Sequence, residues 1–289
     1  MQPDIAKNIS EKLFQRFGIE LLFEIRNQKE GSLLILKPAD LYPKEGFNIN
    51  ILVGWKKLTI SFEPEDNAGE LLLTMGYAAA TNYETFRSMI KSITSEGGSL
   101  VMTINSNPVK LNNISDWPKN WHNLKLVIKS PFIESDTDLA LDRNLEEHIE
   151  KWSTLFFSLI VPMLPLDEQI DIKTEHNVEG LPEGAQLKIL VNRYERSRIN
   201  RQICIVVHGA YCNICGFNFR KQYGVTGEGY IEVHHKVPVS ELGKNYRIDP
   251  INDLIPVCAN CHAMIHKRNP PYSPDEIKLL LSSASQSAI

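Results

Sequence analysis

The stretch C-N-I-C at residues 212–215, followed by I-E-V-H-H at 231–235 and N-D-L-I-P-V-C-A-N-C-H-A-M-I-H at 252–266, decides how the C-terminal part of this chain folds. It contains two C-x-x-C pairs with 42 residues between them. A C-x-x-C turn directs two thiolates toward one point, and a structural Zn²⁺ takes four such ligands at about 2.3 Å. We therefore expect one structural zinc ion, held by Cys212, Cys215, Cys258 and Cys261.

Two disulfides are the alternative interpretation of these four cysteines. The chain opens with the polar sequence M-Q-P-D-I, which predicts no secretory signal. The expected location is therefore the cytoplasm, where the reducing conditions disfavour disulfides. The fifth cysteine, Cys204, lies in the apolar run I-C-I-V-V, and we expect it to be buried in a core.

Four histidines are interleaved with the cysteines. His262 and His266 are four residues apart with no helix breaker before Pro270, so a helix would place both imidazoles on one face. His234 and His235 are adjacent after the β-type run Y-I-E-V, so a strand would direct them to opposite sides. Any one of these histidines alone is more simply explained as a polar residue whose hydrogen bonds are made within the fold. Together, at these spacings, they predict a second metal site beside the zinc.

These motifs resemble the HNH endonucleases (the ββα-metal nucleases), and more narrowly the HNH module of McrA-like restriction endonucleases. The resemblance covers about residues 190–280. It implies a two-stranded hairpin followed by a helix around a catalytic divalent metal, and the hydrolysis of phosphodiester bonds in DNA. By position it assigns His235 as the general base that deprotonates the attacking water. It assigns metal ligation to His234, His262 and His266.

The middle position of the motif departs from the family pattern. It is usually Asn, and here it falls on Asp253, with Asn252 one residue earlier. Either residue could orient His235 through a hydrogen bond, and we favour Asp253. A neutral histidine has a pKa near 6.5, which suits a base that takes a proton from water. The catalytic divalent metal is expected to be Zn²⁺, Ni²⁺, Mn²⁺ or Mg²⁺. A histidine-rich site suits the first three better than Mg²⁺.

Charge favours a nucleic-acid partner locally. The whole chain has 31 Lys and Arg against 35 Asp and Glu, a net charge of −4. Residues 191–270 alone hold eleven basic and six acidic side chains, so the acidic excess lies elsewhere. An ordinary solvated helix is the other interpretation of the arginine-rich part, but beside the HNH motifs we expect phosphate contacts. The candidate DNA-binding residues are Arg193, Arg196, Arg198, Arg201, Lys236, Lys267 and Arg268.

The remainder of the chain predicts an α+β fold. We expect an N-terminal domain over residues 1–166, a polar linker over 167–186 and the HNH domain over 187–289. The apolar run at 155–166 is too short to span a bilayer, so no membrane partner is expected. Periodicity predicts helices at 5–17, 67–95 and 145–163, and strands at 21–25, 32–36, 48–53, 57–62, 100–105 and 124–129.

The N-terminal domain contains all four tryptophans: Trp55, Trp117, Trp121 and Trp152. They raise the hypothesis of an aromatic pocket for a flipped, modified base, although core packing is the simpler account. A protein-binding, oligomerising or signal-sensing domain is an equal alternative.

The leading function is a metal-dependent DNA endonuclease for restriction or anti-phage defence, which the N-terminal domain would direct to modified DNA. A non-catalytic zinc-ribbon DNA-binding protein is the main alternative, although such a module needs only the cysteines. A secreted colicin-like toxin nuclease fits poorly with the polar N-terminus. A homodimer would help to cut both strands, but the sequence does not establish one.

Overall fold

The computed structural model of the chain describes residues 1–39, 45–55, 57–132, 138–164, 166–169, 189–236, 248–268 and 271–287. The chain divides into two compact units, Met1–Ile199 and Asn200–Ile289. The division falls inside helix α5 (Arg193–His208). Residues 170–186 of the expected linker (167–186) lie outside the described residues, so the expected domain boundaries stay predictions.

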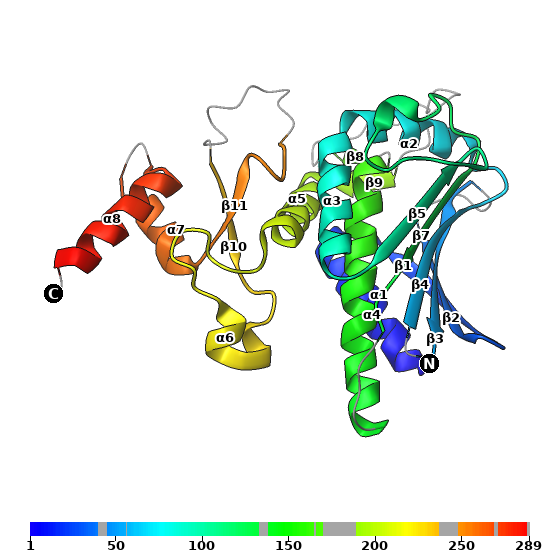
Figure 1. Cartoon of the computed structure of the whole chain (residues 1–289), viewed down its shortest axis with the longest axis horizontal. Coiled ribbons are helices and arrows are strands. Elements are labelled where there is room, and N and C mark those ends of the chain that lie inside the picture. Colours follow the sequence, from blue (N-terminus) through cyan, green and yellow to red (C-terminus); the bar gives the residue numbers. More distant parts are fainter. Residues whose placement is uncertain are drawn as a thin grey trace, which may run out of the picture. The chain divides into compact units, whose positions relative to one another are not determined.

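The N-terminal unit contains a seven-stranded antiparallel sheet in the order β1-β2-β3-β4-β7-β5-β6. All of these strands except β6 are labelled in Figure 1. Alternation of apolar and polar residues makes these segments strands with one buried face. The strands are β1 (Leu21–Gln28), β2 (Gly31–Pro38), β3 (Phe47–Gly54), β4 (Lys57–Pro64), β5 (Ser99–Ile104), β6 (Asn107–Pro108) and β7 (Leu124–Lys129).

Helices pack against one face of this sheet, and Figure 1 shows α1, α3 and α4 on that side. The helices of the unit are α1 (Pro3–Phe17), α2 (Gly69–Thr81), α3 (Tyr83–Ser95) and α4 (Asp138–Ile160), with 3-10 turns at Ile114–Asp116 and Val161–Met163. Buried apolar side chains of these helices and of β2, β3, β4 and β7 belong to the core of the unit. Each large side chain buried there contributes about 1.5–3 kcal/mol.

One expected element proved wrong. The single helix expected over residues 67–95 is two helices, α2 and α3, which meet at Asn82. The backbone of Asn82 leaves helical geometry (φ −105°, ψ 25°), and its side-chain amide donates to the carbonyl of Pro162 at 2.8 Å. This distant contact ends α2 where the sequence has neither Gly nor Pro.

The tryptophans divide between core and surface. Trp117, Trp121 and Trp152 are buried, which confirms the packing account for these three. Trp55 is 89% exposed at the turn between β3 and β4. The described residues therefore contain no pocket formed by all four rings.

The C-terminal unit is built around a short antiparallel hairpin and a helix. Strand β10 (Glu232–His235) pairs with β11 (Leu254–Val257), and α7 (Ala259–Ile265) follows directly. The remaining elements are α6 (Phe219–Tyr223), the 3-10 turn η3 (Gly224–Gly227) and α8 (Pro274–Ser287). A small core that includes Ile231, Val257 and Ile265 joins them.

Two further findings complete the fold. Two short strands, β8 (Leu166–Gln169) and β9 (Ile189–Asn192), pair in parallel. Across the described residues, no helix is both long and apolar enough to cross a membrane. The mixture of helices and sheet fits the expected α+β class.

Candidate metal and catalytic site

The four cysteines of the two C-x-x-C pairs come together in the C-terminal unit. Their sulfur atoms all lie within 4.8 Å of one another, and Cys215 Sγ is 3.7 Å from Cys258 Sγ. All four are free thiols. Tetrahedral thiolates around zinc lie about 3.8 Å apart, so this donor set fits a structural Zn²⁺.

The two pairs are built in the same way from separate parts of the chain. Within each pair the backbone N–H of the second cysteine points to the sulfur of the first, 3.5 Å away, for Cys215 with Cys212 and for Cys261 with Cys258. Cys258 is the N-cap of α7, while Gly216 turns the chain after the first pair with φ 75°. The cysteines therefore fix the start of α7 against the segment that precedes β10.

Electrostatics in this cluster favour a cation. Burial raises the pKa of Cys212, but hydrogen bonds with backbone groups of Cys215, Cys258 and Ile214 outweigh burial, and this pKa falls to about 7. Burial and the neighbouring sulfur atoms raise the pKa of Cys261. One thiolate therefore forms readily, whereas further negative charge requires a metal to balance it.

The histidines form a second group of donors. His234, His262 and His266 place ring nitrogens within 4.8 Å of one another, with ring centroids 5.0–5.2 Å apart. His234 comes from β10, His262 lies within α7, and His266 is the C-cap of that helix. Three imidazoles on a strand and a helix fit a divalent metal with open coordination positions.

Glu232 is a residue of this site that the sequence interpretation missed. Its Oε2 lies 2.6 Å from Nδ1 of His262, which leaves Nε2 of that ring for a metal. Glu232 precedes His234 by two residues in β10, so strand alternation puts both side chains on one side. That alternation was the available signal, but the partner lies 30 residues later, on α7.

His234 is held neutral by its surroundings. Burial lowers its pKa, and repulsion from His262, His266 and His235 lowers it further, to about 4. A neutral imidazole is the form that ligates a metal, so the site is prepared for one at neutral pH.

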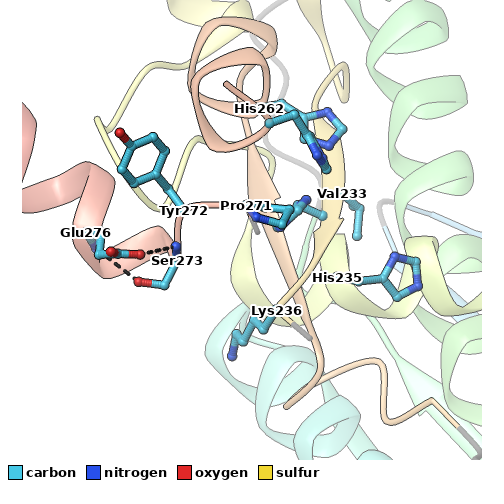
Figure 2. A pocket seen from close by; sticks show the side chains of 10 residues that line it. Val233, His235, Lys236, His262, Pro271, Tyr272, Ser273 and Glu276 are labelled. Atoms are coloured by element: carbon cyan, nitrogen blue, oxygen red, sulfur yellow. Dashed lines mark hydrogen bonds between the residues drawn. The ribbon is translucent and has the colours of Figure 1, made fainter. Parts of the chain in front are cut away.

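His235 lies on the other side of the same strand. In Figure 2 its ring is directed away from His262, although both residues line one pocket of about 420 Å³. Burial lowers the pKa of His235, while the carboxylate of Asp253 opposes part of this shift. His235 and the three-histidine group therefore line one cavity.

The two candidates for the middle position have different partners. The Asp253 carbonyl accepts the backbone N–H of Lys236 at 2.8 Å, directly beside the end of β10. Its carboxylate accepts the N–H of Asp249 at 2.7 Å. Asn252 is exposed, and its amide donates to Asp249 at 2.7 Å. Asp253 is thus the candidate that acts electrostatically on His235.

The start of α8 forms a wall of the pocket that the sequence interpretation did not assign. Ser273 and Glu276 form a reciprocal cap: Ser273 N–H donates to Glu276 Oε2 at 2.7 Å, and Glu276 N–H donates to Ser273 Oγ at 3.2 Å (Figure 2). The sequence S-P-D-E at 273–276 is the signature of such a capping box. Arg268 bonds the same carboxylate at 3.0 Å and lies 3.9 Å over the ring of Tyr272.

The other candidate DNA-binding residues have different surroundings. Lys236 is exposed and lines the pocket, and Lys267 is exposed after α7. Arg201 donates to the carbonyl of Ile231 at 2.6 Å, so part of its guanidinium supports the start of β10. Arg198 is half-buried on α5, while the side chains of Arg193 and Arg196 lie outside the described part.

Cys204 is fully buried, as expected, and burial raises the pKa of its thiol to about 12. This thiol is therefore unreactive at neutral pH and belongs to the core.

A comparison with protein families identifies this region. The family model described as HNH endonuclease matches residues 212–268, which contain all four clustered cysteines and all four histidines of the pocket. No curated protein and no solved structure matches the chain. The match therefore supports an HNH endonuclease domain at residues 212–268 and does not extend to the N-terminal unit.

Proposed function

We propose that the C-terminal unit is a metal-dependent nuclease that hydrolyses phosphodiester bonds in DNA. One observation carries this proposal: the three-histidine donor group and His235 line a single pocket beside the four-cysteine cluster. A zinc-ribbon module that only binds DNA needs the cysteines but has no use for this second donor group. The histidine arrangement therefore favours catalysis over binding alone.

His235 acts as the general base in this proposal. Its neutral ring takes a proton from water as the water oxygen bonds to phosphorus, and the bond from phosphorus to the 3′ oxygen breaks. The carboxylate of Asp253 stabilises the protonated ring that results. A metal held by His234, His262 and His266 would offset the charge that develops on the phosphate. The 3′ oxygen takes its proton from solvent, which leaves a 3′ hydroxyl and a 5′ phosphate.

The histidine donors also rank the candidate catalytic metals. Imidazole nitrogens suit Zn²⁺, Ni²⁺ and Mn²⁺ better than Mg²⁺, and Glu232 supports this by fixing the ring of His262. The four-cysteine cluster holds a separate, structural Zn²⁺. The exposed Lys236 at the pocket contacts a phosphate of the substrate.

We further propose a role in restriction or anti-phage defence in the cytoplasm, similar to that of McrA-like enzymes, in which the N-terminal unit selects the DNA. Support for this comes from the domain organisation: a nuclease domain of fewer than 100 residues is joined to a larger unit with its own core. A homodimer would bring two pockets to the two strands of one duplex.

The test uses the purified full-length protein with unmodified, methylated and hypermodified phage DNA, each with Mg²⁺, Mn²⁺ or Ni²⁺. We expect cleavage with Mn²⁺ or Ni²⁺ and a preference for modified DNA. Binding without cleavage under every metal would instead identify a non-catalytic zinc-ribbon protein. Equal cleavage of all three DNAs would contradict the proposed selection of modified DNA, but it would still support the nuclease proposal.

A further inference from the structure

Trp55 stands apart from the other tryptophans of the chain. It lies between β3 and β4 and is 89% exposed, whereas Trp117, Trp121 and Trp152 are at most 8% exposed. Burying an aromatic ring of this size is strongly favourable, so the fold gains little from a tryptophan in this position. A large exposed aromatic side chain is more typical of a binding surface.

A second exposed aromatic residue lies beside this turn. Phe132 is 70% exposed, and the ammonium of Lys57 sits 5.3 Å from the centre of its ring. Ser130 holds this segment in place, because it donates its N–H to the Leu58 carbonyl at 3.0 Å and accepts the Leu58 N–H on its hydroxyl at 3.0 Å. Phe132 is therefore anchored next to the first residues of β4.

The turn between β1 and β2 lies at the same end of the sheet. Gly31 is packed so closely on β3 that a Cβ there would lie 2.0 Å from the carbonyl oxygen of Val53, and a Cβ on Gly54 would lie 3.5 Å from the carbonyl of Glu30. The exposed Lys29 is part of this turn. The ends of two hairpins thus form one surface, which we call the aromatic tip: Lys29, Trp55, Lys57 and Phe132.

Lys129 extends the positive charge of the tip. It pairs with Thr59 across β4 and β7, and its neighbour Ile128 is buried toward the helices. By strand alternation Lys57 and Lys129 both face the side of the sheet opposite the helices. Lys29, Lys57 and Lys129 therefore lie at the same end of the sheet as the two exposed rings. Glu30 is the acidic residue of the β1–β2 turn.

We propose that the aromatic tip contacts DNA, with Trp55 and Phe132 stacking on unpaired or unstacked bases and the lysines contacting phosphates. Sequence-tolerant single-strand sites combine these same two elements, aromatic platforms and cations along the backbone. The N-terminal unit as a whole is acidic, so a favourable electrostatic contact with DNA requires a locally basic surface such as this tip. The inference rests on the proposed function and assigns part of substrate selection to the N-terminal unit.

The experiment compares full-length Trp55→Ala with a matched control, Tyr77→Ala, which removes a 66% exposed ring from α2. Both changes are made in a His235→Ala background, so that the DNA stays intact. The probe is a fluorescein-labelled duplex with a short central mismatch bubble, and its affinity is measured by anisotropy. Trp55→Ala is expected to raise the Kd about tenfold, in line with the loss of one stacked base, and Tyr77→Ala to leave it unchanged.

Tryptophan fluorescence gives a second readout that does not depend on affinity. Trp55 is the exposed fluorophore, so the bubble duplex is expected to quench the red edge of the emission and to protect it from acrylamide. This response disappears in Trp55→Ala. An unchanged Kd in Trp55→Ala together with unquenched Trp55 emission would overturn the proposal.

Two further outcomes would also overturn it by pointing to another partner. Protection of Trp55 by anionic lipid vesicles but not by DNA would identify a membrane surface. Loss of self-association in Trp55→Ala, measured by sedimentation without DNA, would identify a second copy of the chain. The nuclease proposal is tested separately: if the wild type cleaves DNA but Trp55→Ala leaves the Kd unchanged and Trp55 emission is not quenched, only this inference is wrong. DNA binding that depends on Trp55, without cleavage by the wild type, would contradict only the nuclease proposal.

Discussion

At the residue scale, the proposed site depends on a pair of neighbouring histidines to which we assign different tasks. Strand β10 directs His234 toward the donors of α7 and His235 to the other side of the strand. Glu232 and Asp253 are the carboxylates that act on these rings, the first on His262 and the second on His235. Each carboxylate therefore has a distinct and separable effect.

Replacement of Glu232 tests its positioning role. Glu232→Gln removes the carboxylate from Nδ1 of His262, so the ring loses its fixed orientation, and affinity for Ni²⁺ at the three-histidine group should fall about 10–100-fold. The measurement is a competition titration with a chelating dye on zinc-loaded protein. Glu228→Gln, on an exposed acid paired with Arg220, is the control. Unchanged Ni²⁺ affinity in Glu232→Gln would argue against the role.

The pH dependence of cleavage tests Asp253. In the proposed mechanism His235 acts as a base only when its ring is neutral. Burial lowers the pKa of His235, and the Asp253 carboxylate raises it again in part. Asp253→Asn removes the negative charge that raises the pKa of His235. This pKa should therefore fall, and the acid limb of the kcat/KM profile should move to lower pH. The profile is measured between about pH 4 and 8 at saturating metal. A limb that stays in place, or that moves to higher pH, would assign the middle position to another residue.

At the element scale, spacing within one element was predictable and contacts between elements were not. The positions of His262 and His266 follow from a four-residue helical spacing, and those of the cysteines from two local turns. Glu232 was missed because its partner lies on α7, and the break at Asn82 because its cause is the distant Pro162 carbonyl. Composition likewise could not distinguish Trp55 from the three buried tryptophans.

The cysteine cluster is expected to hold α7 in place. Cys258→Ala removes both a proposed zinc ligand and the N-cap of α7, so zinc should be lost and the amides of residues 254–268 should exchange rapidly. Zinc content and hydrogen exchange are the measurements. Cys204→Ala, at a buried cysteine outside the cluster, is expected to cost about 1 kcal/mol of stability and to keep the zinc. Full zinc retention in Cys258→Ala would contradict the cluster's role.

The junction of α3 with the sheet offers a stability test in the N-terminal unit. A Cβ on Gly98 would lie 2.5 Å from the buried ring of Trp152, so Gly98→Ala should lower the free energy of unfolding by about 1–3 kcal/mol. Gly69 at the start of α2 has nothing within 4 Å, and Gly69→Ala should be neutral or stabilising by up to about 1 kcal/mol. Denaturant unfolding measures the change in the free energy of unfolding for both variants. Equal changes would show that the Trp152 ring moves aside for the added methyl group.

At the scale of the whole molecule, charge is unevenly distributed along the chain. Residues 191–270 hold eleven of the 31 basic side chains but only six of the 35 acidic ones. The nuclease region therefore attracts DNA, while most of the remaining chain repels it. We infer that DNA meets the protein at few places, which are the nuclease pocket and, in our further proposal, the aromatic tip.

Salt dependence tests this distribution. Each phosphate contact contributes about −0.9 to the slope of log K against log salt. Lys236→Ala, which removes an exposed cation at the pocket, should make the slope shallower by about 1. Lys91→Ala, on the exposed side of α3, should leave it unchanged. Equal slopes in both variants would place the DNA elsewhere.

The central claim is that His235 drives hydrolysis from the pocket of the HNH domain. The most direct measurement is the single-turnover rate of DNA cleavage by His235→Ala, with His122→Ala on an exposed histidine of the N-terminal unit as the control. Cleavage by His235→Ala is expected to fall about 10²–10⁴-fold with zinc content and DNA affinity retained, while His122→Ala cleaves at the wild-type rate. Cleavage by His235→Ala at the wild-type rate would contradict the account.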